Sequence, residues 1–396
     1  MIGVAILGCG TIGSGVAEIL MDGSDNLAKK TGAELKLVRV LDKRDFTGQV
    51  VAKYVTGDIG EILNDKSVQI VVETMGGLEP AHDFVQRALE SGKHVVTSNK
   101  DMVERFGAEL LGVAEKHGVS FLFEASVGGG VPVIHAEVST LVTDKITGIE
   151  GIINGTTNYI LGRMADEGLS FEDALSGAQA EGFAEKNPES DVEAHDPARK
   201  LAILLSLATG KDVDFKDIER TGISKITAKD MSAAKHFGRR IKLLIEAEIS
   251  EDGKEIKARV SPTAVRADST FAHVKGPFNA VTFRGLYAGE VTLYGMGAGK
   301  MPTAQAIISD VIEAVTAKDT VVRNWGSECI GVSSMRRGAA LVRFNAEQKN
   351  AEELFGVKAE NIFDLGFGEC AFIVPAEKRE AADNCADVVS IINVME

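Results

Sequence analysis

The chain has 396 residues and a formal net charge of −15, with 44% hydrophobic and 26% charged residues. That length suits two or three domains, each with a core of its own. The negative balance argues against nucleic acid or an anionic membrane as a partner. The four cysteines show neither disulfide nor metal spacing, Met1 leads straight into an apolar strand, and no apolar run could span a bilayer. We therefore expect a cytoplasmic protein without a signal peptide.

The first third of the chain alternates strand-like and helix-like patterns. Strands are predicted at 2–7, 35–41, 68–72, 94–97 and 120–123, and helices after residue 13, over 80–89 and over 101–117. Apolar strands that alternate with helices indicate a parallel sheet covered on both faces. We expect an α/β domain of Rossmann type over residues 1–130, completed by about 297–330.

The pattern changes after three consecutive glycines at 128–130. Helices dominate from 157 to 210, strands follow at 240–249, 255–261, 280–284 and 290–294, and a helix is predicted over 301–317. This order indicates an α+β domain with an antiparallel sheet over residues 131–296. The tail, 339–396, has a βαββαβ pattern with strands at 340–344, 362–367, 370–374 and 388–394 and helices at 351–355 and 377–386.

A glycine motif follows the first strand and opens the first helix. In Gly8-x-Gly10-x-x-Gly13, the first glycine permits a tight turn, the second admits the pyrophosphate of a dinucleotide, and the third allows close packing. The backbone amides of Thr11 and Ile12 would face the pyrophosphate from the helix N-terminus. This context favours NAD or NADP binding over a simple glycine-rich turn.

Three charged residues at the end of the second strand leave the choice of cofactor open. Asp42 could accept hydrogen bonds from the ribose hydroxyls of NAD, whereas Lys43 and Arg44 could neutralise the 2′-phosphate of NADP. The separation of Asp42 from Gly13 is longer than usual, which we ascribe to a loop insertion over 22–32.

An acidic segment over 182–200 ends in the pattern of a helix start. We expect Asp196 to be the N-cap and Pro197 the first helical residue. Lys200 lies four positions after Asp196 and would share its helix face. The carboxylate and the amine could hold an amino-acid ammonium and move a hydroxyl proton, or they could belong to an ordinary helix end.

Several blocks of sequence resemble homoserine dehydrogenases and occur in that family's order. They are residues 73–81, 92–100, 124–132, 154–161, 182–200 and 297–304. The resemblance implies reversible, NAD(P)-dependent hydride transfer between L-homoserine and L-aspartate 4-semialdehyde, in threonine, methionine and isoleucine biosynthesis. It also implies a homodimer or homotetramer that acts on this small-molecule substrate.

The resemblance implies roles for individual residues. Lys200 and Lys100 match catalytic lysines, and a lysine can carry the proton at a substrate oxygen if partial burial lowers its pKa. The implied substrate-binding residues are Glu185, Asp196, Asp191, Gly155 and Thr156, and the further cofactor-binding residues are Thr74, Ser98, Lys100, Gly182, Gly297 and Gly299. The chain departs from the family in having Ala194 where glycine is usual and Pro197 where alanine is common.

A sodium site is also implied, formed by Glu124, Val127, Gly129 and Val131. One carboxylate and three backbone carbonyls would suit a hard monovalent ion. The alternative is a glycine-rich crossing between domains, with Glu124 capping a neighbouring group.

The tail resembles the ACT regulatory module of many homoserine dehydrogenases, but it lacks the Asp-x-Pro-Gly turn expected after its first strand. We therefore expect a structural or dimerisation role for the tail rather than amino-acid sensing.

Two other functions stay open at this point. One is another Rossmann dehydrogenase of amino-acid metabolism, although aspartate-semialdehyde dehydrogenase is disfavoured because no cysteine nucleophile lies between Cys9 and Cys329. The other is a non-catalytic, dinucleotide-binding amino-acid sensor, which would not need Lys100 and Lys200.

Overall fold

The computed structural model describes residues 1–396 except 23–26, 30–31, 33, 347 and 396. A six-stranded parallel sheet forms the first part of the molecule, in the order β3-β2-β1-β4-β5-β6. Its strands are β1 (Ile2–Leu7), β2 (Leu35–Leu41), β3 (Val55–Thr56), β4 (Val68–Glu73), β5 (His94–Thr97) and β6 (Phe121–Leu122). This confirms the predicted Rossmann-type sheet; only the two-residue β3 was not expected. The predicted insertion over 22–32 lies largely outside the described residues.

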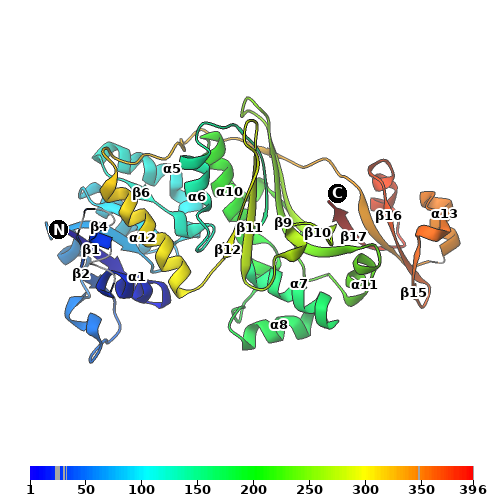
Figure 1. Cartoon of the computed structure of the whole chain (residues 1–396), viewed down its shortest axis with the longest axis horizontal. Coiled ribbons are helices and arrows are strands. Elements are labelled where there is room, and N and C mark those ends of the chain that lie inside the picture. Colours follow the sequence, from blue (N-terminus) through cyan, green and yellow to red (C-terminus); the bar gives the residue numbers. More distant parts are fainter. Residues whose placement is uncertain (23–26, 30–31, 33, 347, 396) are drawn as a thin grey trace.

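Helices cover both faces of this sheet, because alternate strand residues point to opposite sides. Val4 and Ile6 pack with α1 (Thr11–Asp22) and α12 (Lys300–Thr316), whereas Ala5 and Leu7 face the core shared with α4 (Ala81–Glu90) and α5 (Lys100–His117). A short α3 (Ile59–Leu63) precedes β4. Helix α12, yellow in Figure 1, returns from far along the chain to lie against α1.

A second, larger sheet occupies the centre and the other end of the molecule (Figure 1). Its central strands are β7 (Ile146–Ile152), β9 (Arg239–Ile249), β10 (Ile256–Arg266), β11 (Phe278–Gly285) and β12 (Gly289–Met296), in the order β12-β11-β7-β9-β10. All four pairings in this row are antiparallel, as predicted. The sequence analysis missed β7, whose two glycines weaken its strand pattern. Two short strands, β8 (Glu219–Arg220) and β13 (Val332–Ser333), pair with β10.

The predicted helical run packs beside this sheet. It consists of α7 (Gly155–Glu167), α8 (Phe171–Ala180), α9 (Glu189–Val192) and α10 (His195–Thr209), preceded by α6 (Val133–His135) with a π-helical turn (Ala136–Thr140) and followed later by α11 (Ala228–His236). Short 3-10 helices lie at Val50–Tyr54, Glu124–Ser126, Phe215–Asp217, Phe271–His273, Ala359–Asn361 and Ala376–Lys378. Helix α10 buries its leucine-rich face and packs against α5 of the first part and β9 and β10 of the second sheet.

The tail folds as the predicted βαββαβ unit. It contains β14 (Ala340–Phe344), α13 (Gln348–Phe355), β15 (Phe363–Gly366), β16 (Glu369–Val374), α14 (Arg379–Asp383) and β17 (Val388–Val394). The order β17-β14-β16-β15 is the ferredoxin-like arrangement. Strand β17 also pairs in parallel with β10, through Thr263 with Asn393 and Ala264 with Val394. The tail therefore extends the second sheet, which the sequence pattern did not show.

None of the helices in the described part of the chain combines the length and the apolar character needed to cross a bilayer. All four cysteines are free thiols.

Candidate active site

Two lysines meet one buried aspartate where the two sheets adjoin. Lys100 Nζ lies 2.6 Å from Asp196 Oδ1, and Lys200 Nζ donates to Asp196 Oδ2 at 2.8 Å. Lys200 Nζ also donates to the carbonyl oxygen of Ile153 at 2.9 Å, and Asn154 Nδ2 donates to Asp196 Oδ2 at 2.7 Å. Lys100 comes from α5 and Lys200 from α10, so this cluster joins both parts of the molecule.

The starts of two helices set these positions. Asn99 caps α5 by accepting a hydrogen bond from the Met102 amide, which places Lys100 at the first helical residue. Helix α10 begins at His195, two residues before the predicted first helical residue Pro197, and its N-cap is Ala194. The prediction that Asp196 caps this helix is wrong, because its carboxylate is directed to the two lysines.

Ala194 adopts a left-handed backbone with φ 63°. An alanine is strained in this region, where glycine is at ease. This is the position at which the chain departs from the glycine usual in the family it resembles. The departure therefore keeps the backbone turn and stores a little strain just before Asp196.

The pKa values of Asp196 and Lys100 are set more by their opposite charges than by burial. Burial by itself raises the pKa of Asp196, which is 1% exposed, but the two lysine ammonium groups hold the pKa well below its usual range. Burial by itself lowers the pKa of Lys100, yet the attraction of Asp196 leaves that pKa above its ordinary value. Asp191 accepts a hydrogen bond from Asn154 Nδ2 at 2.7 Å, and burial together with the nearby charge of Asp196 raises its pKa.

The expected substrate residues Gly155 and Thr156 open α7, directly after the cap Asn154. Thr156 Oγ1 donates to the carbonyl oxygen of Phe183 at 2.8 Å, which brings the 182–185 loop close to this helix start. Gly182, in that loop, has φ 78°. The structure does not bring Glu185 into the cluster: its side chain is exposed and has no hydrogen bond among the described residues.

The glycine turn has the geometry expected for a dinucleotide. Gly8 has φ 88°, and a Cβ on Gly13 would stand 2.0 Å from the carbonyl oxygen of Gly8, so only glycine fits there. A Cβ on Gly10 would meet nothing within 4 Å, which leaves that face of the loop open. Thr74 Oγ1 donates to the Gly8 carbonyl at 2.6 Å, and Thr11 and Ile12 start α1. The turn is therefore held by Thr74 on one side, and its face at Gly10 is open to a ligand.

Asp42 and Arg44, which the sequence analysis assigned to NAD and to NADP respectively, are hydrogen-bonded to each other. Asp42 accepts from the Cys9 amide at 2.8 Å and from Arg44 Nη2 at 2.6 Å and Nε at 2.9 Å. The Arg44 guanidinium holds the pKa of Asp42 far below its usual range. Arg44 remains largely exposed and Lys43 is exposed.

Two of the places at which the chain crosses between the two sheets touch each other. A Cβ on Gly129 would stand 2.2 Å from the carbonyl oxygen of Gly297, and the Gly130 amide donates to the Met296 carbonyl at 3.0 Å. Gly299 has φ 126° and precedes α12. Ser98 follows β5 at the carboxyl edge of the parallel sheet. The expected cofactor residues therefore come from both crossings and from the carboxyl edge of the first sheet.

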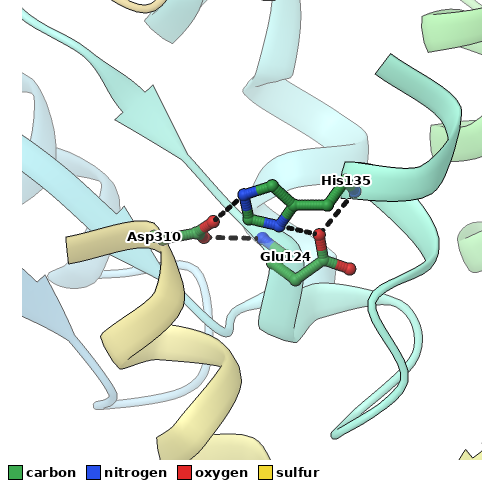
Figure 2. A group of neighbouring side chains, drawn as sticks. All are labelled: Glu124, His135 and Asp310. Atoms are coloured by element: carbon green, nitrogen blue, oxygen red, sulfur yellow. Dashed lines mark hydrogen bonds and ion pairs between the residues drawn. The ribbon is translucent and has the colours of Figure 1, made fainter. Parts of the chain in front are cut away.

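A second charged cluster lies at the same junction (Figure 2). Glu124 Oε2 accepts from the His135 amide and lies 2.6 Å from His135 Nδ1, while the Glu124 amide donates to Asp310 at 2.8 Å. His135 Nε2 lies 2.8 Å from Glu313. Hydrogen bonds to Glu124 and Glu313 raise the pKa of His135 to about 10, and burial raises the pKa of Asp310 to about 8.

These contacts test the expected sodium ligands. The Glu124 carboxylate accepts from the amides of Ile134 and His135 and from the His135 ring, so it serves as a helix cap. The carbonyl of Val131 accepts from the Val133 amide at 2.8 Å. The backbone carbonyls of Val127 and Gly129 accept no hydrogen bond from the described residues. A carboxylate has about four lone-pair sites and a carbonyl two, so the four expected ligands stay a prediction.

Sequence reasoning assigned no role to Asn154, which links Asp191 to Asp196 and caps α7. Its signal was an asparagine before a helix start, which is a common cap. Nothing in the sequence indicated that its side-chain amide would also bind the carboxylates of Asp191 in α9 and Asp196 in α10.

Comparisons with known proteins agree with this geometry. The family model for homoserine dehydrogenase matches residues 132–312, and the model for the homoserine dehydrogenase NAD-binding domain matches residues 8–124. The homoserine dehydrogenase of Synechocystis is 43% identical over 79% of this chain and 73% of its own length, and that of Bacillus subtilis is 40% identical over 78% and 72%.

Solved structures extend the likeness to the tail. A homoserine dehydrogenase from Thiobacillus denitrificans has a TM-score of 0.88 and 31% identity, covering 100% of this chain and 98% of that chain. A hyperthermophilic archaeal homoserine dehydrogenase in complex with NADPH has a TM-score of 0.66 and 26% identity, covering 81% of this chain and 99% of that one. The chain belongs to the homoserine dehydrogenase family, and it is an NAD(P)-dependent oxidoreductase that interconverts L-homoserine and L-aspartate 4-semialdehyde.

Proposed function

We propose that the cluster of Lys100, Asp196 and Lys200 is where proton transfer accompanies this reaction. The observation that carries the proposal is one fully buried carboxylate shared by two lysines from different parts of the molecule. A buried ion pair is weak evidence for stability, and charged groups with perturbed pKa values cluster at functional sites.

Lys200 is the proton carrier in this proposal. An ammonium has three donors, and two of those of Lys200 are used by Ile153 and Asp196. The third is left for the substrate oxygen, and its side chain is 12% exposed, so little water competes. When L-homoserine is oxidised, the hydroxyl proton passes to the Lys200 amine; in the other direction Lys200 returns a proton to the aldehyde oxygen.

Asp196 acts mainly on the lysines. Its Oδ2 accepts from Lys200 and Asn154, and its Oδ1 is ion-paired with Lys100. It therefore holds both amines in place, and the substrate ammonium is left to Asp191 and Glu185, which have fewer partners. Gly155 and Thr156 at the start of α7 offer amides and a hydroxyl to the substrate carboxylate.

The proposed dinucleotide site consists of the glycine turn together with Thr74, Ser98, Gly182, Gly297 and Gly299. A bound nicotinamide cofactor supplies the hydride acceptor or donor. The family match supports NAD or NADP. In this proposal Asp42 would accept a hydrogen bond from a ribose hydroxyl of NAD, and the exposed Arg44 would pair with the 2′-phosphate of NADP.

We propose further that the tail is structural and that the chain assembles as a homodimer or homotetramer in the cytoplasm. The tail's continuity with β10 supports the structural role. The proposed sodium ligands are the Glu124 carboxylate and the backbone carbonyls of Val127, Gly129 and Val131. Thermal unfolding in sodium chloride against choline chloride at equal ionic strength tests this, with a sodium-specific rise of the midpoint as the expected result.

The direct experiment measures homoserine-dependent reduction of NAD and of NADP separately. We expect activity with at least one of them, lost when homoserine is replaced by threonine, which carries its hydroxyl on another carbon. Reduction of neither dinucleotide by a folded protein would contradict the proposal and favour a non-catalytic sensor.

A further inference from the structure

Asn279, on β11, has a carboxamide without a protein partner. Its exposed fraction is 0%, and neither Oδ1 nor Nδ2 is hydrogen-bonded by any described group. A carboxamide offers an acceptor and two N–H donors, and burying all of them unpaired is costly. Because native proteins pair nearly all such groups, the partner of Asn279 must come from outside the chain.

Gly297 covers the flat face of the Asn279 carboxamide, but this contact gives the polar atoms at the edge of the amide no hydrogen-bond partner. A Cβ on Gly297 would stand 2.2 Å from both Cγ and Oδ1 of Asn279 and 2.4 Å from Nδ2. These nearly equal distances place Gly297 over the flat face of the amide. The edge, which carries the donors and the acceptor, therefore points away from Gly297. Any side chain at Gly297 would collide with Asn279, so this glycine is required by packing.

The neighbours of Asn279 belong to the proposed active site on both sides. Pro277 accepts a hydrogen bond from the Gly297 amide at 3.2 Å, and it lies 3.1 Å from where a Cβ on Gly155 would be. Ala280 pairs with Ile152, and the next residue, Ile153, binds Lys200. Asn279 thus stands between the crossing assigned to the cofactor and the segment that holds the proton carrier.

We propose that the Asn279 carboxamide recognises the carboxamide of the nicotinamide ring. The proposal rests on the assignment of Gly297 and Gly299 to cofactor binding. Two carboxamides are complementary, since each presents an N–H donor and a C=O acceptor. The neutral amide suits this group better than the charged ends of homoserine, which call for ionic partners. Because the amide is fully buried, the proposal requires the backbone at Gly297, which carries no side chain, to move aside when the cofactor binds.

The test compares binding of NAD with binding of its 3-acetylpyridine analogue, which keeps the carbonyl but lacks the N–H donors. Calorimetry on the whole protein gives both dissociation constants without turnover. We expect the unchanged chain to prefer NAD, and Asn279→Leu to bind NAD about tenfold more weakly and to lose the preference. Its thermal midpoint without dinucleotide should stay unchanged or rise, because leucine removes an unpaired polar group.

Asn158→Leu is the matched control. Asn158 is also buried, but its amide donates to Val274 and Gly276 and accepts from Lys242. We expect this variant to lower the midpoint and to keep the preference for NAD. An Asn279→Leu protein that keeps the preference, or that loses stability with unchanged affinities, overturns the proposal and indicates a buried water. If the unchanged chain binds neither NAD nor NADP, the cofactor assignment itself is contradicted.

Discussion

Two charged clusters join the two sheets, and they differ in the balance of charge. Around Asp196, two lysines surround one carboxylate, and Lys100 and Lys200 keep 36% and 12% of their side chains exposed. Around His135, one imidazole lies among the carboxylates of Glu124, Asp310 and Glu313, two of which are almost completely buried.

The difference shows how buried ions can serve reaction or architecture. A cluster with more donors than acceptors, and with an accessible amine, has a proton to offer to a substrate. In the His135 cluster the Glu124 carboxylate caps α6 and Glu313 pairs with His135, while Asp310 Oδ1 has no hydrogen bond to a described residue. This cluster offers no amine to a substrate. We therefore expect the Asp196 cluster to control turnover and the His135 cluster to control stability.

Replacement of Lys200 should have the largest effect. Lys200→Ala is expected to lower turnover by at least ~10²-fold, the usual contribution of a general acid-base group, and to leave dinucleotide affinity nearly unchanged. Steady-state kinetics and calorimetry measure the two effects. Lys211→Ala, which removes an exposed partner of Glu328, is the control. Near-normal turnover of Lys200→Ala would remove the proposed distinction between the clusters.

His135→Gln should lower stability instead. The imidazolium bridges carboxylates at a junction between the sheets, and removing one member of a buried pair costs about 3 kcal/mol. Urea unfolding measures this loss, with turnover at moderate temperature expected to be unchanged. His117→Gln, at the exposed end of α5, is the control. A lost turnover with preserved stability would show that this cluster also serves the reaction.

Glu185→Gln tests whether a residue outside the Asp196 cluster still contacts substrate. The variant keeps its shape and loses its charge, so we expect the KM for homoserine to rise about tenfold while turnover changes little. Glu189→Gln, in the neighbouring α9, serves as a control. If both variants behave like the unchanged chain, Glu185 is only a surface residue.

Arg44→Ala should have a smaller effect, confined to the cofactor. Loss of the guanidinium is expected to weaken NADPH binding several-fold relative to NADH, because only NADPH carries the 2′-phosphate. Fluorescence titration of both dinucleotides gives the ratio. An unchanged ratio would place the 2′-phosphate elsewhere and leave Asp42 as the only ribose contact.

The smallest effect is expected from amino-acid effectors. A titration of threonine, and separately of methionine and isoleucine, at subsaturating homoserine should leave activity unchanged, because the tail lacks the Asp-x-Pro-Gly turn. Cooperative inhibition at low threonine concentration that vanishes when 339–396 is deleted would contradict this.

The sequence by itself determined the elements and most of the chemistry at their ends. The predicted bounds of β1, β2, β5, β14 and β17 agree with the structure residue for residue. Period-two and period-3.6 patterns and glycine punctuation are local signals, so they survive without knowledge of the fold. The family motifs likewise indicated Lys100, Lys200 and the glycine turn before any geometry was known.

Only the tertiary structure decided which of these residues meet. The sequence predicts that Asp196 caps a helix, yet its carboxylate forms ion pairs with two lysines from separate helices. The pairing of β17 with β10 and the contact of Asn279 with Gly297 also join residues that the local pattern treats separately. Side-chain partners in a buried junction depend on how sheets and helices pack, because burial makes every unpaired polar atom costly and so selects partners from the whole chain.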